Sequence, residues 1–223
     1  MGVVVFRNAD FIIADKPHGI PTVPLKGQEA DGTLLGLAAA ECPEILCVRG
    51  RNPWECGAVH RLDTATSGLV LFALTQDAYG YLMEIQKKDL LDKTYEARVI
   101  RDDRLRGFDP PALRIGATFT IMSYFRSYGP KSMEVRPVED IKRADTPVLY
   151  TTYVTYAGQD IVHCTITRGF RHQIRAHLAW AGLPIEGDPV YGPSASPEVP
   201  LALDCRKVSF PASDGERFSF SKT

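Results

Sequence analysis

The most informative part of the chain reads His60-Arg61-Leu62-Asp63-Thr64-Ala65-Thr66-Ser67-Gly68-Leu69 and continues into the apolar residues 70–74. The uninterrupted apolar run predicts a buried strand over 69–74, with a Thr-Ser-Gly turn before it and another strand over 58–62. A turn that presents one acid and one arginine beside a buried strand indicates a carboxylate held in a fixed place. Since a single aspartate is more often a solvated or ion-paired turn residue, a catalytic role for Asp63 needs support from elsewhere.

Two later stretches carry polar side chains suited to a functional site. Residues 93–99 read Lys-Thr-Tyr-Glu-Ala-Arg-Val and predict a strand over 94–100 that carries Tyr95. Residues 167–178 read Thr-Arg-Gly-Phe-Arg-His-Gln-Ile-Arg-Ala-His-Leu and predict a basic helix N-terminus. His172 and His177 are five residues apart, so they do not share a helical face as a pair of metal ligands would. No carboxylate or cysteine completes a ligand set, and we predict no metal site.

Together these stretches resemble the motifs of the RluA-type pseudouridine synthases. The first is similar to the family's H-R-L-D-x-x-T-S-G, and the second to its Lys-x-Tyr strand. The third, which continues to Gly182-Leu183-Pro184-Ile185-Glu186-Gly187-Asp188, resembles G-R-x-H-Q-I-R-x-H-L followed by G-x-P-I-x-G-D. Residues 15–19, Asp-Lys-Pro-His-Gly, resemble the family's K-P-x-G loop. The resemblance extends over nearly the whole chain.

The resemblance carries expectations about fold and activity. It implies that residues 1–223 form a single pseudouridine synthase catalytic domain, with no N-terminal RNA-binding module of the S4 type. The implied fold is α+β, with a mixed, mostly antiparallel sheet, a few flanking helices and a central active-site cleft. The implied activity is that of an isomerase, an intramolecular transferase that converts uridine to pseudouridine in ribosomal or transfer RNA without a cofactor.

The resemblance also assigns residues to the site. It implies that Asp63 is the catalytic carboxylate, that Tyr95 is the active-site tyrosine and that Arg175 pairs with the carboxylate. Arg61 is expected to fill the space left by a flipped-out nucleotide, and Ile174 to line the pocket. The implied substrate-binding residues are His60, Arg61, Arg171, His172, Gln173 and Ile174.

These residue types suit the chemistry of the implied reaction. Isomerisation breaks the N1–C1′ bond of uridine, turns the base and joins C5 to the same carbon, with no net redox change or hydrolysis. One carboxylate can begin it, either as a nucleophile or by removing the C2′ proton, and the sequence leaves both routes open. An arginine keeps a desolvated carboxylate ionised and oriented. The ring of Tyr95 offers a stacking surface to the base, and its hydroxyl a route for the C5 proton.

The third motif departs from the family pattern at one place. The usual Gly-Arg-x-His becomes Gly169-Phe170-Arg171-His172, so the arginine stands one position later. Arg175 stays in register, but an RNA contact by Arg171 does not follow directly from the motif. A smaller departure is Leu74, where many family members carry lysine.

Charge and composition agree only in part with an RNA partner. The net charge of −1 provides no overall attraction to phosphates. Residues 48–185 carry 19 basic and 15 acidic side chains, whereas the two flanks together carry 7 and 12, so a local cationic surface is expected. The candidate phosphate contacts are Arg49, Arg51, Lys87, Lys88, Arg98, Arg101, Arg104, Arg106, Arg168 and Arg171.

The cysteines and the apolar segments point to a cellular location. Five scattered cysteines form no C-x-x-C pair, and the chain shows neither a secretory segment nor an apolar run long enough to cross a bilayer. We therefore expect a cytoplasmic protein with reduced thiols, which acts on RNA as a monomer and without a membrane.

The order of predicted elements favours the α+β class. Most of the chain reads as strands in hairpin-like succession, with helices expected over 33–40, 76–88 and 172–181. Strand and helix do not alternate, so a mixed or antiparallel sheet is favoured over a doubly wound one. Gly182 stands where a left-handed helix C-terminus is expected, and residues 157–160 read as a hairpin turn.

Two other functions stay open on the sequence alone. The chain could bind or remodel RNA without catalysis, although all three catalytic positions are filled. It could also be an unrelated hydrolase that uses Asp63 with His60 or His172, although no G-x-S-x-G motif supplies a nucleophile. Paired binding and activity assays distinguish the first alternative, and release of free uracil would indicate the second.

Overall fold

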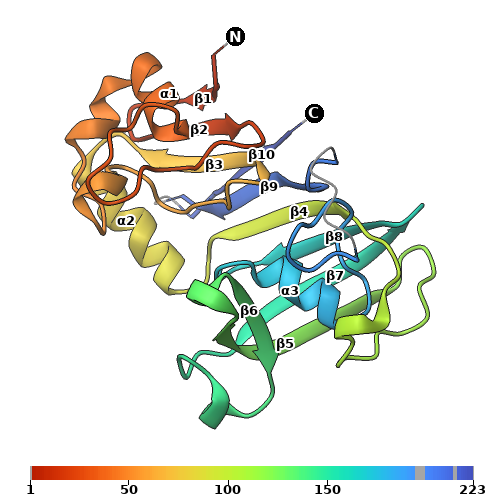
Figure 1. Cartoon of the computed structure of the whole chain (residues 1–223). Coiled ribbons are helices and arrows are strands. Elements are labelled where there is room, and N and C mark those ends of the chain that lie inside the picture. The colour runs from red at the N-terminus through yellow and green to blue at the C-terminus, as the bar shows by residue number, and fades with distance from the viewer. Residues whose placement is uncertain (1, 194–198, 213–214, 223) are drawn as a thin grey trace. The chain divides into compact units, whose positions relative to one another are not determined.

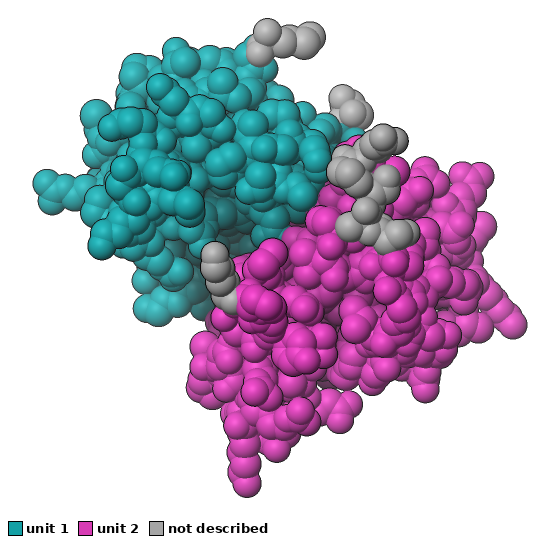
Figure 2. Space-filling view, viewed as in Figure 1, with its two compact units in different colours: residues 1–93, 204–223 teal, residues 94–203 magenta. Residues whose placement is uncertain are grey.

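Strands dominate both of the units into which the chain divides. The computed structural model describes residues 2–193, 199–212 and 215–222. Unit 1 comprises residues 1–93 and 204–223, and unit 2 comprises residues 94–203 (Figures 1 and 2). The mixture of strands with a few helices confirms the α+β class predicted from the sequence.

The sheet of unit 1 combines antiparallel pairs with one parallel contact. β1 (Val4–Arg7), β2 (Phe11–Lys16) and β3 (Ser67–Ala73) pair antiparallel in that order, and β9 (Leu203–Pro211) joins β3 in parallel. β10 (Arg217–Ser221) pairs antiparallel with β9. The predicted strand over 69–74 is confirmed as β3, and burial of nearly all its residues explains why its sequence is continuously apolar.

Two predicted helices of unit 1 are confirmed with nearly the expected bounds. α1 (Leu34–Glu41) begins after Thr33, whose hydroxyl accepts from a backbone amide, and α2 (Gln76–Lys87) begins in the same way after Thr75. Such caps satisfy backbone amides that have no partner inside the helix. The segment between α1 and β3 contains two 3₁₀ turns, η1 (Pro43–Cys47) and η2 (Pro53–Glu55).

The strand predicted over 58–62 is wrong. This segment makes only an isolated bridge between Ala58 and Phe72. The physical reason is a side-chain contact, because the backbone amide of Leu71 donates to Nε2 of His60 at 3.2 Å rather than to the carbonyl of a neighbouring strand. The segment therefore lies along β3 without forming a ladder.

Gly68 lets β3 and β9 approach each other. Its φ is +111°, and an added Cβ would lie 2.4 Å from the backbone nitrogen and oxygen of Cys205. Any side chain here would force the two strands apart. Beside it, the hydroxyl of Ser67 donates to a carboxylate oxygen of Asp204 at 2.6 Å. The close approach of two strands thus explains the glycine of the Thr-Ser-Gly turn.

The sheet of unit 2 is ordered β4, β8, β7, β5 and β6. These strands are β4 (Asp92–Arg98), β5 (Thr118–Tyr128), β6 (Glu134–Val138), β7 (Tyr150–Gly158) and β8 (Ile161–Ile166). Gln159 and Asp160 both have positive φ, and this confirms the predicted turn between β7 and β8. The loops contain the 3₁₀ turns η3 (Asp103–Leu105), η4 (Pro130–Ser132) and η5 (Ile141–Arg143).

One helix, α3 (Gln173–Trp180), packs against the sheet of unit 2 (Figure 1). Its C-terminus has the predicted left-handed glycine, because Gly182 has a φ of +71°. The amide of Gly182 donates to the carbonyl of Ala179 at 3.0 Å, and that of Leu183 donates to the carbonyl of Leu178 at 2.8 Å. This pair of bonds satisfies carbonyls that the end of the helix would otherwise leave without donors.

Helix α3 is buried along nearly its whole length, from Gln173 to Ala179. The side-chain Nε2 of Gln173 donates to the carbonyl of Thr151 at 2.9 Å and to Oγ1 of Thr152 at 3.2 Å. The hydroxyl of Thr152 in turn contacts Nδ1 of His177 at 2.8 Å, and Nε2 of His177 contacts Oγ of Ser123 at 2.9 Å. The buried side chains of Gln173 and His177 are therefore satisfied by the strands on which the helix packs.

We expect the free energy of unfolding to depend on pH through His177. Burial lowers the pKa of this imidazole to about 3, whereas it is near 6.5 in an unfolded chain. Protonation of the unfolded chain therefore removes stability, which is fully present above pH 6.5 and declines as the pH falls toward 3. His177→Gln should be less stable by about 1–3 kcal/mol at pH 7. Urea unfolding should show this difference narrowing toward pH 4, and a constant difference would contradict a buried neutral imidazole.

Candidate active site

Asp63 projects from a loop whose backbone is fixed on both sides. The hydroxyl of Thr22 accepts from the amide of Leu62 at 3.0 Å and donates to the carbonyl of the same residue at 2.9 Å. On the other side, the amide of Thr66 donates to the carbonyl of Asp63 at 3.0 Å. The half-buried carboxylate is therefore carried by a well-defined turn that leads into β3.

A buried lysine from the end of β2 holds the residue that follows Asp63. The ammonium group of Lys16 donates to the carbonyls of Pro17 at 3.0 Å, Ile20 at 2.7 Å and Thr64 at 3.1 Å. Burial lowers the pKa of Lys16 to about 8, and the negative charge of Asp63 opposes this shift. The carboxylate of Asp63 thus lies within electrostatic reach of a buried cation of the same unit.

The two residues before Leu62 have different environments. The exposed Arg61 donates from Nη1 to a carboxylate oxygen of the buried Glu55 at 2.9 Å. His60 is only 8% exposed and accepts the amide of Leu71. Burial, aided by the charge of Lys93, lowers the pKa of His60 to about 3, so its ring is neutral at pH 7. His60 thus supports β3 from within unit 1, and its contact with RNA stays a prediction.

Tyr95 lies on the α3 face of the unit 2 sheet. Its neighbour Thr94 contacts the hydroxyl of Thr165 at 3.0 Å, and Thr165 pairs with the exposed Tyr153 on β7. These side chains mark the open face of the sheet. Because successive side chains of a strand point to opposite faces, the buried Tyr95 points to the face that α3 covers. Tyr95 and Arg175 therefore lie on the same face of unit 2.

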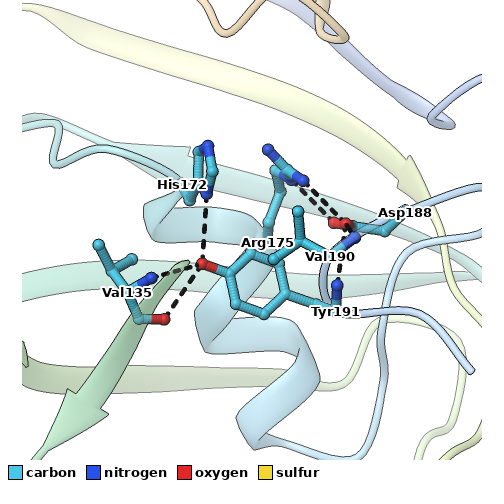
Figure 3. Close-up of polar contacts among 6 residues, drawn as sticks. All are labelled: Val135, His172, Arg175, Asp188, Val190 and Tyr191. Atoms are coloured by element: carbon cyan, nitrogen blue, oxygen red, sulfur yellow. Dashed lines mark hydrogen bonds and ion pairs between the residues drawn. The ribbon is translucent and has the colours of Figure 1, made fainter. Parts of the chain in front are cut away.

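Arg175 forms a buried two-bond ion pair with Asp188 (Figure 3). Its Nε donates to Oδ2 of Asp188 at 2.8 Å, and its Nη2 donates to Oδ1 at 2.8 Å. The side chains are 4% and 0% exposed. Burial alone would raise the pKa of Asp188, but the hydrogen bonds and charge of Arg175, together with the amides of Val190 and Tyr191, outweigh it and lower that pKa.

Tyr191 connects this ion pair to the edge of the sheet (Figure 3). Its hydroxyl accepts from the amide of Val135 at 2.9 Å, donates to the carbonyl of the same residue at 3.1 Å and contacts Nδ1 of His172 at 3.3 Å. Burial raises the pKa of Tyr191 to about 12, so the phenol stays protonated. Cζ of Arg175 lies 5.4 Å from the centre of the Tyr191 ring, within the range of a cation–π contact.

The other residues predicted to bind substrate surround the start of α3. Arg171 is exposed and donates to the backbone carbonyls of Ser132 and Glu134, which joins the helix start to the β5–β6 connection. His172 is half-buried beside Tyr191, while Gln173 and Ile174 are buried. The contacts of Gln173 are structural within unit 2, because its side chain bonds to β7 and to the amide of Phe170. A contact of these residues with RNA stays a prediction.

The structure places two members of the predicted catalytic set in the same unit. Tyr95 and Arg175 share one face of unit 2, whereas Asp63 belongs to unit 1. The meeting of all three in one cleft stays a prediction. Sequence reasoning assigned no role to Asp188, although it quoted this residue as the last position of the third motif. Nor did it assign one to Lys16, whose signal was the Lys16-Pro17 pair at the end of β2.

The described part of the chain contains no group of three or more His, Cys, Asp or Glu side chains arranged to hold a metal ion. Within the same residues, no helix has both the length and the apolar character needed to cross a membrane.

Comparison with known proteins identifies the family. The sequence model of a family described as RNA pseudouridylate synthase matches residues 10–180. The chain belongs to the RNA pseudouridylate synthase family. The match begins in unit 1 and continues through α3 of unit 2, and it includes Asp63, Tyr95 and Arg175.

Individual relatives of this family confirm the RluA-type resemblance. "Ribosomal large subunit pseudouridine synthase D" of Pseudomonas aeruginosa is 29% identical over 189 residues, which cover 85% of this chain and 53% of the relative. "tRNA pseudouridine(31) synthase" of Saccharomyces cerevisiae is 30% identical over 203 residues, which cover 84% of this chain and 46% of the relative. The chain thus spans about half the length of these relatives.

Solved structures agree with the fold. "Human RNA Pseudouridylate Synthase Domain Containing 1" matches 99% of this chain and 82% of its own with a TM-score of 0.69 at 21% identity. "Human RNA Pseudouridylate Synthase Domain Containing 4" matches 99% of this chain and 87% of its own with a TM-score of 0.66 at 17% identity. The predicted pseudouridine synthase fold is therefore confirmed.

We expect Lys16→Met to loosen the turn that carries Asp63. The substitution keeps an apolar stem but removes the donor shared by three carbonyls, and should cost about 1–3 kcal/mol of unfolding free energy. The amides of Gly19 and Thr66, which belong to the same turn, should exchange hydrogen faster. Hydrogen exchange with mass or NMR detection measures this. The exposed Lys26→Met serves as the control and should change stability by less than about 0.5 kcal/mol; equal effects of both variants would refute the supporting role of Lys16.

Proposed function

We propose that this protein is an RNA pseudouridine synthase that isomerises uridine to pseudouridine in ribosomal or transfer RNA. The observation that supports it most is the family match over residues 10–180, which includes the aspartate, the tyrosine and the arginine that the motif resemblance assigns to catalysis. Relatives named for ribosomal and for transfer RNA are almost equally similar to the chain, so both RNA classes belong to the proposal.

In this proposal, the carboxylate of Asp63 starts the reaction at the ribose. It acts on C1′ as a nucleophile or removes the C2′ proton, and either route needs a carboxylate held in one orientation. The fixed turn around Asp63 supports such a role, because the neighbouring backbone bonds to Thr22 and Lys16. Tyr95 would stack on the base and pass on the C5 proton, and Arg175 would pair with the carboxylate.

The target carbon of a stacked uridine is out of reach, so the nucleotide must leave the helix at a cost of a few kcal/mol. Arg61 is proposed to fill the vacated space. Its exposed guanidinium is paired with Glu55, and this single contact would hold the side chain near the turn before RNA arrives. We further propose that the protein acts in the cytoplasm as a monomer.

We expect Asp63→Asn to abolish isomerisation while leaving the fold intact. The amide has the same shape as the carboxylate but is neither a comparable nucleophile nor a base, so the rate should fall by at least about 10³-fold. Tritium release from [5-³H]uridine in transcribed large-subunit ribosomal RNA and transfer RNA measures the reaction.

The exposed Asp77→Asn provides a matched control, since it makes the same chemical change on the first turn of α2. It should retain full activity, and both variants should show the circular dichroism spectrum of the wild type. Substantial pseudouridine formation by Asp63→Asn would refute the assigned role. RNA binding by the wild type without tritium release from either RNA would instead favour a binding protein.

We expect the affinity for RNA to fall as the salt concentration rises, with a slope that is small for an RNA-binding protein. Among the candidate phosphate contacts, Lys87, Arg98, Arg104 and Arg106 form ion pairs with exposed or partly exposed acids, which reduces the positive field. Each neutralised phosphate adds about −0.7 to −0.9 to the slope of log affinity against log salt. A binding titration should give a slope of about −2 to −4, and a flat response would exclude phosphate contacts.

A further inference from the structure

Asp188 is a buried carboxylate that bonds both to its own loop and to the guanidinium of Arg175. It is 1% exposed, and its two carboxylate oxygens accept hydrogen bonds from different donors. Among the described residues, Oδ2 accepts a hydrogen bond from Nε of Arg175, whereas Oδ1 accepts one from Nη2 of Arg175 and two from the backbone amides of Val190 and Tyr191, at 2.8 and 3.1 Å (Figure 3). The bonds to the amides hold the carboxylate in one position on its own loop. The guanidinium that bonds to this carboxylate is therefore held in one position as well.

We propose that Asp188 is a positioning residue for Arg175 in uridine isomerisation, an inference that rests on the proposed function. A guanidinium has five N–H donors in one plane. Asp188 accepts Nε–H and one proton of Nη2, and this two-bond contact fixes both the plane and the rotation of the group. The donors on its opposite edge consequently point in one direction, toward whatever the arginine serves.

The surroundings of the pair reinforce this orientation. The ring of Tyr191 lies beside the guanidinium, and the hydroxyl of the same residue is fixed to both backbone groups of Val135 and to His172. Asp188, Tyr191, α3 and β6 thus form a single frame within unit 2 (Figure 3). A long arginine side chain in such a frame loses little further freedom when it meets a substrate or a carboxylate.

The ion pair also determines how Arg175 acts. Because Asp188 is ionised and lies at hydrogen-bond distance, the two charges nearly cancel beyond the pair. Arg175 therefore contributes through the direction of its hydrogen bonds and adds little net positive field for attracting RNA. This predicts that a disturbed pair slows the chemical step, while the affinity for RNA and its salt dependence change little.

Asp188→Asn separates the two tasks of the carboxylate. The asparagine oxygen can remain at the Oδ1 position, where it still accepts the amides of Val190 and Tyr191. Its NH₂ group then occupies the Oδ2 position and faces Nε–H of Arg175, where two donors cannot bond. The variant keeps the loop contacts and loses the orientation of the guanidinium.

The decisive measurement is the single-turnover rate constant at saturating protein, because this rate constant does not depend on the fraction of folded protein. With [5-³H]uridine-labelled ribosomal and transfer RNA, Asp188→Asn should lower it by about 100-fold, as expected when a reacting group is misplaced by about 1 Å. The dissociation constant for RNA should change by less than about threefold.

A control for simple destabilisation comes from β5, which packs against the same helix. Ser123→Ala removes a hydrogen bond of the buried His177 and so lowers the melting temperature without touching Arg175 or Asp188. It should leave the single-turnover rate within about threefold of the wild type. Equal rates for Asp188→Asn and the wild type, or equal losses in Asp188→Asn and Ser123→Ala, would overturn the positioning role.

A spectroscopic measurement tests the orientation without activity. In ¹⁵N-labelled protein, the Nε–H of Arg175 should give a resolved, slowly exchanging signal that broadens or exchanges rapidly in Asp188→Asn, and an unchanged signal would overturn the proposal. If Asp188→Asn does not fold, Asp188→Glu replaces it, since this variant keeps the charge and shifts it by one methylene. Wild-type kinetics in Asp188→Glu would likewise overturn the proposal. A wild type that binds RNA but releases no tritium would instead refute the proposed function, whatever the NMR result.

Discussion

The burial of α3 is the constraint on which the rest of unit 2 depends. This short helix carries glutamine, arginine and histidine side chains that are all removed from water. Each would be costly to bury without a partner. The partners come from separate parts of the chain: β7 for Gln173, β5 and β7 for His177, and the loop after the helix for Arg175. Placing one helix therefore fixes the strands, the loop and the guanidinium together.

Unit 1 solves a similar problem around Asp63 with a different device. The backbone carbonyls of a loop have no partners in a β-ladder, and here the buried ammonium group of Lys16 donates hydrogen bonds to three of them. Thr22 bonds to both backbone groups of Leu62 on the other side of the carboxylate. The loop that carries the acid proposed for catalysis is thus held by side-chain hydrogen bonds to its backbone. A reaction that depends on the orientation of the carboxylate needs such a fixed backbone.

Sequence patterns predicted most elements because their causes are local. Threonine caps, the period of apolar residues and a glycine at a helix end act within a few positions, so α1, α2, α3 and β3 were placed almost correctly. The strand predicted over 58–62 is wrong because the pattern of apolar residues does not show what the ring of His60 binds. That ring accepts the hydrogen bond of the Leu71 amide, which a β-ladder between this segment and β3 would need. The same hydrogen bond makes His60 a support for β3.

The sequence by itself determined the α+β class, the family, and the identity of the acid, the phenol and the guanidinium in the three motifs. Only the tertiary structure decided what holds these groups: Asp188 for Arg175, and Lys16 and Thr22 for the turn of Asp63. The reason is the separation of the partners along the chain. Thr64 is 48 positions from Lys16, and Leu62 is 40 positions from Thr22. No local pattern relates such residues, and they meet only because the burial of β2 and β3 brings them together.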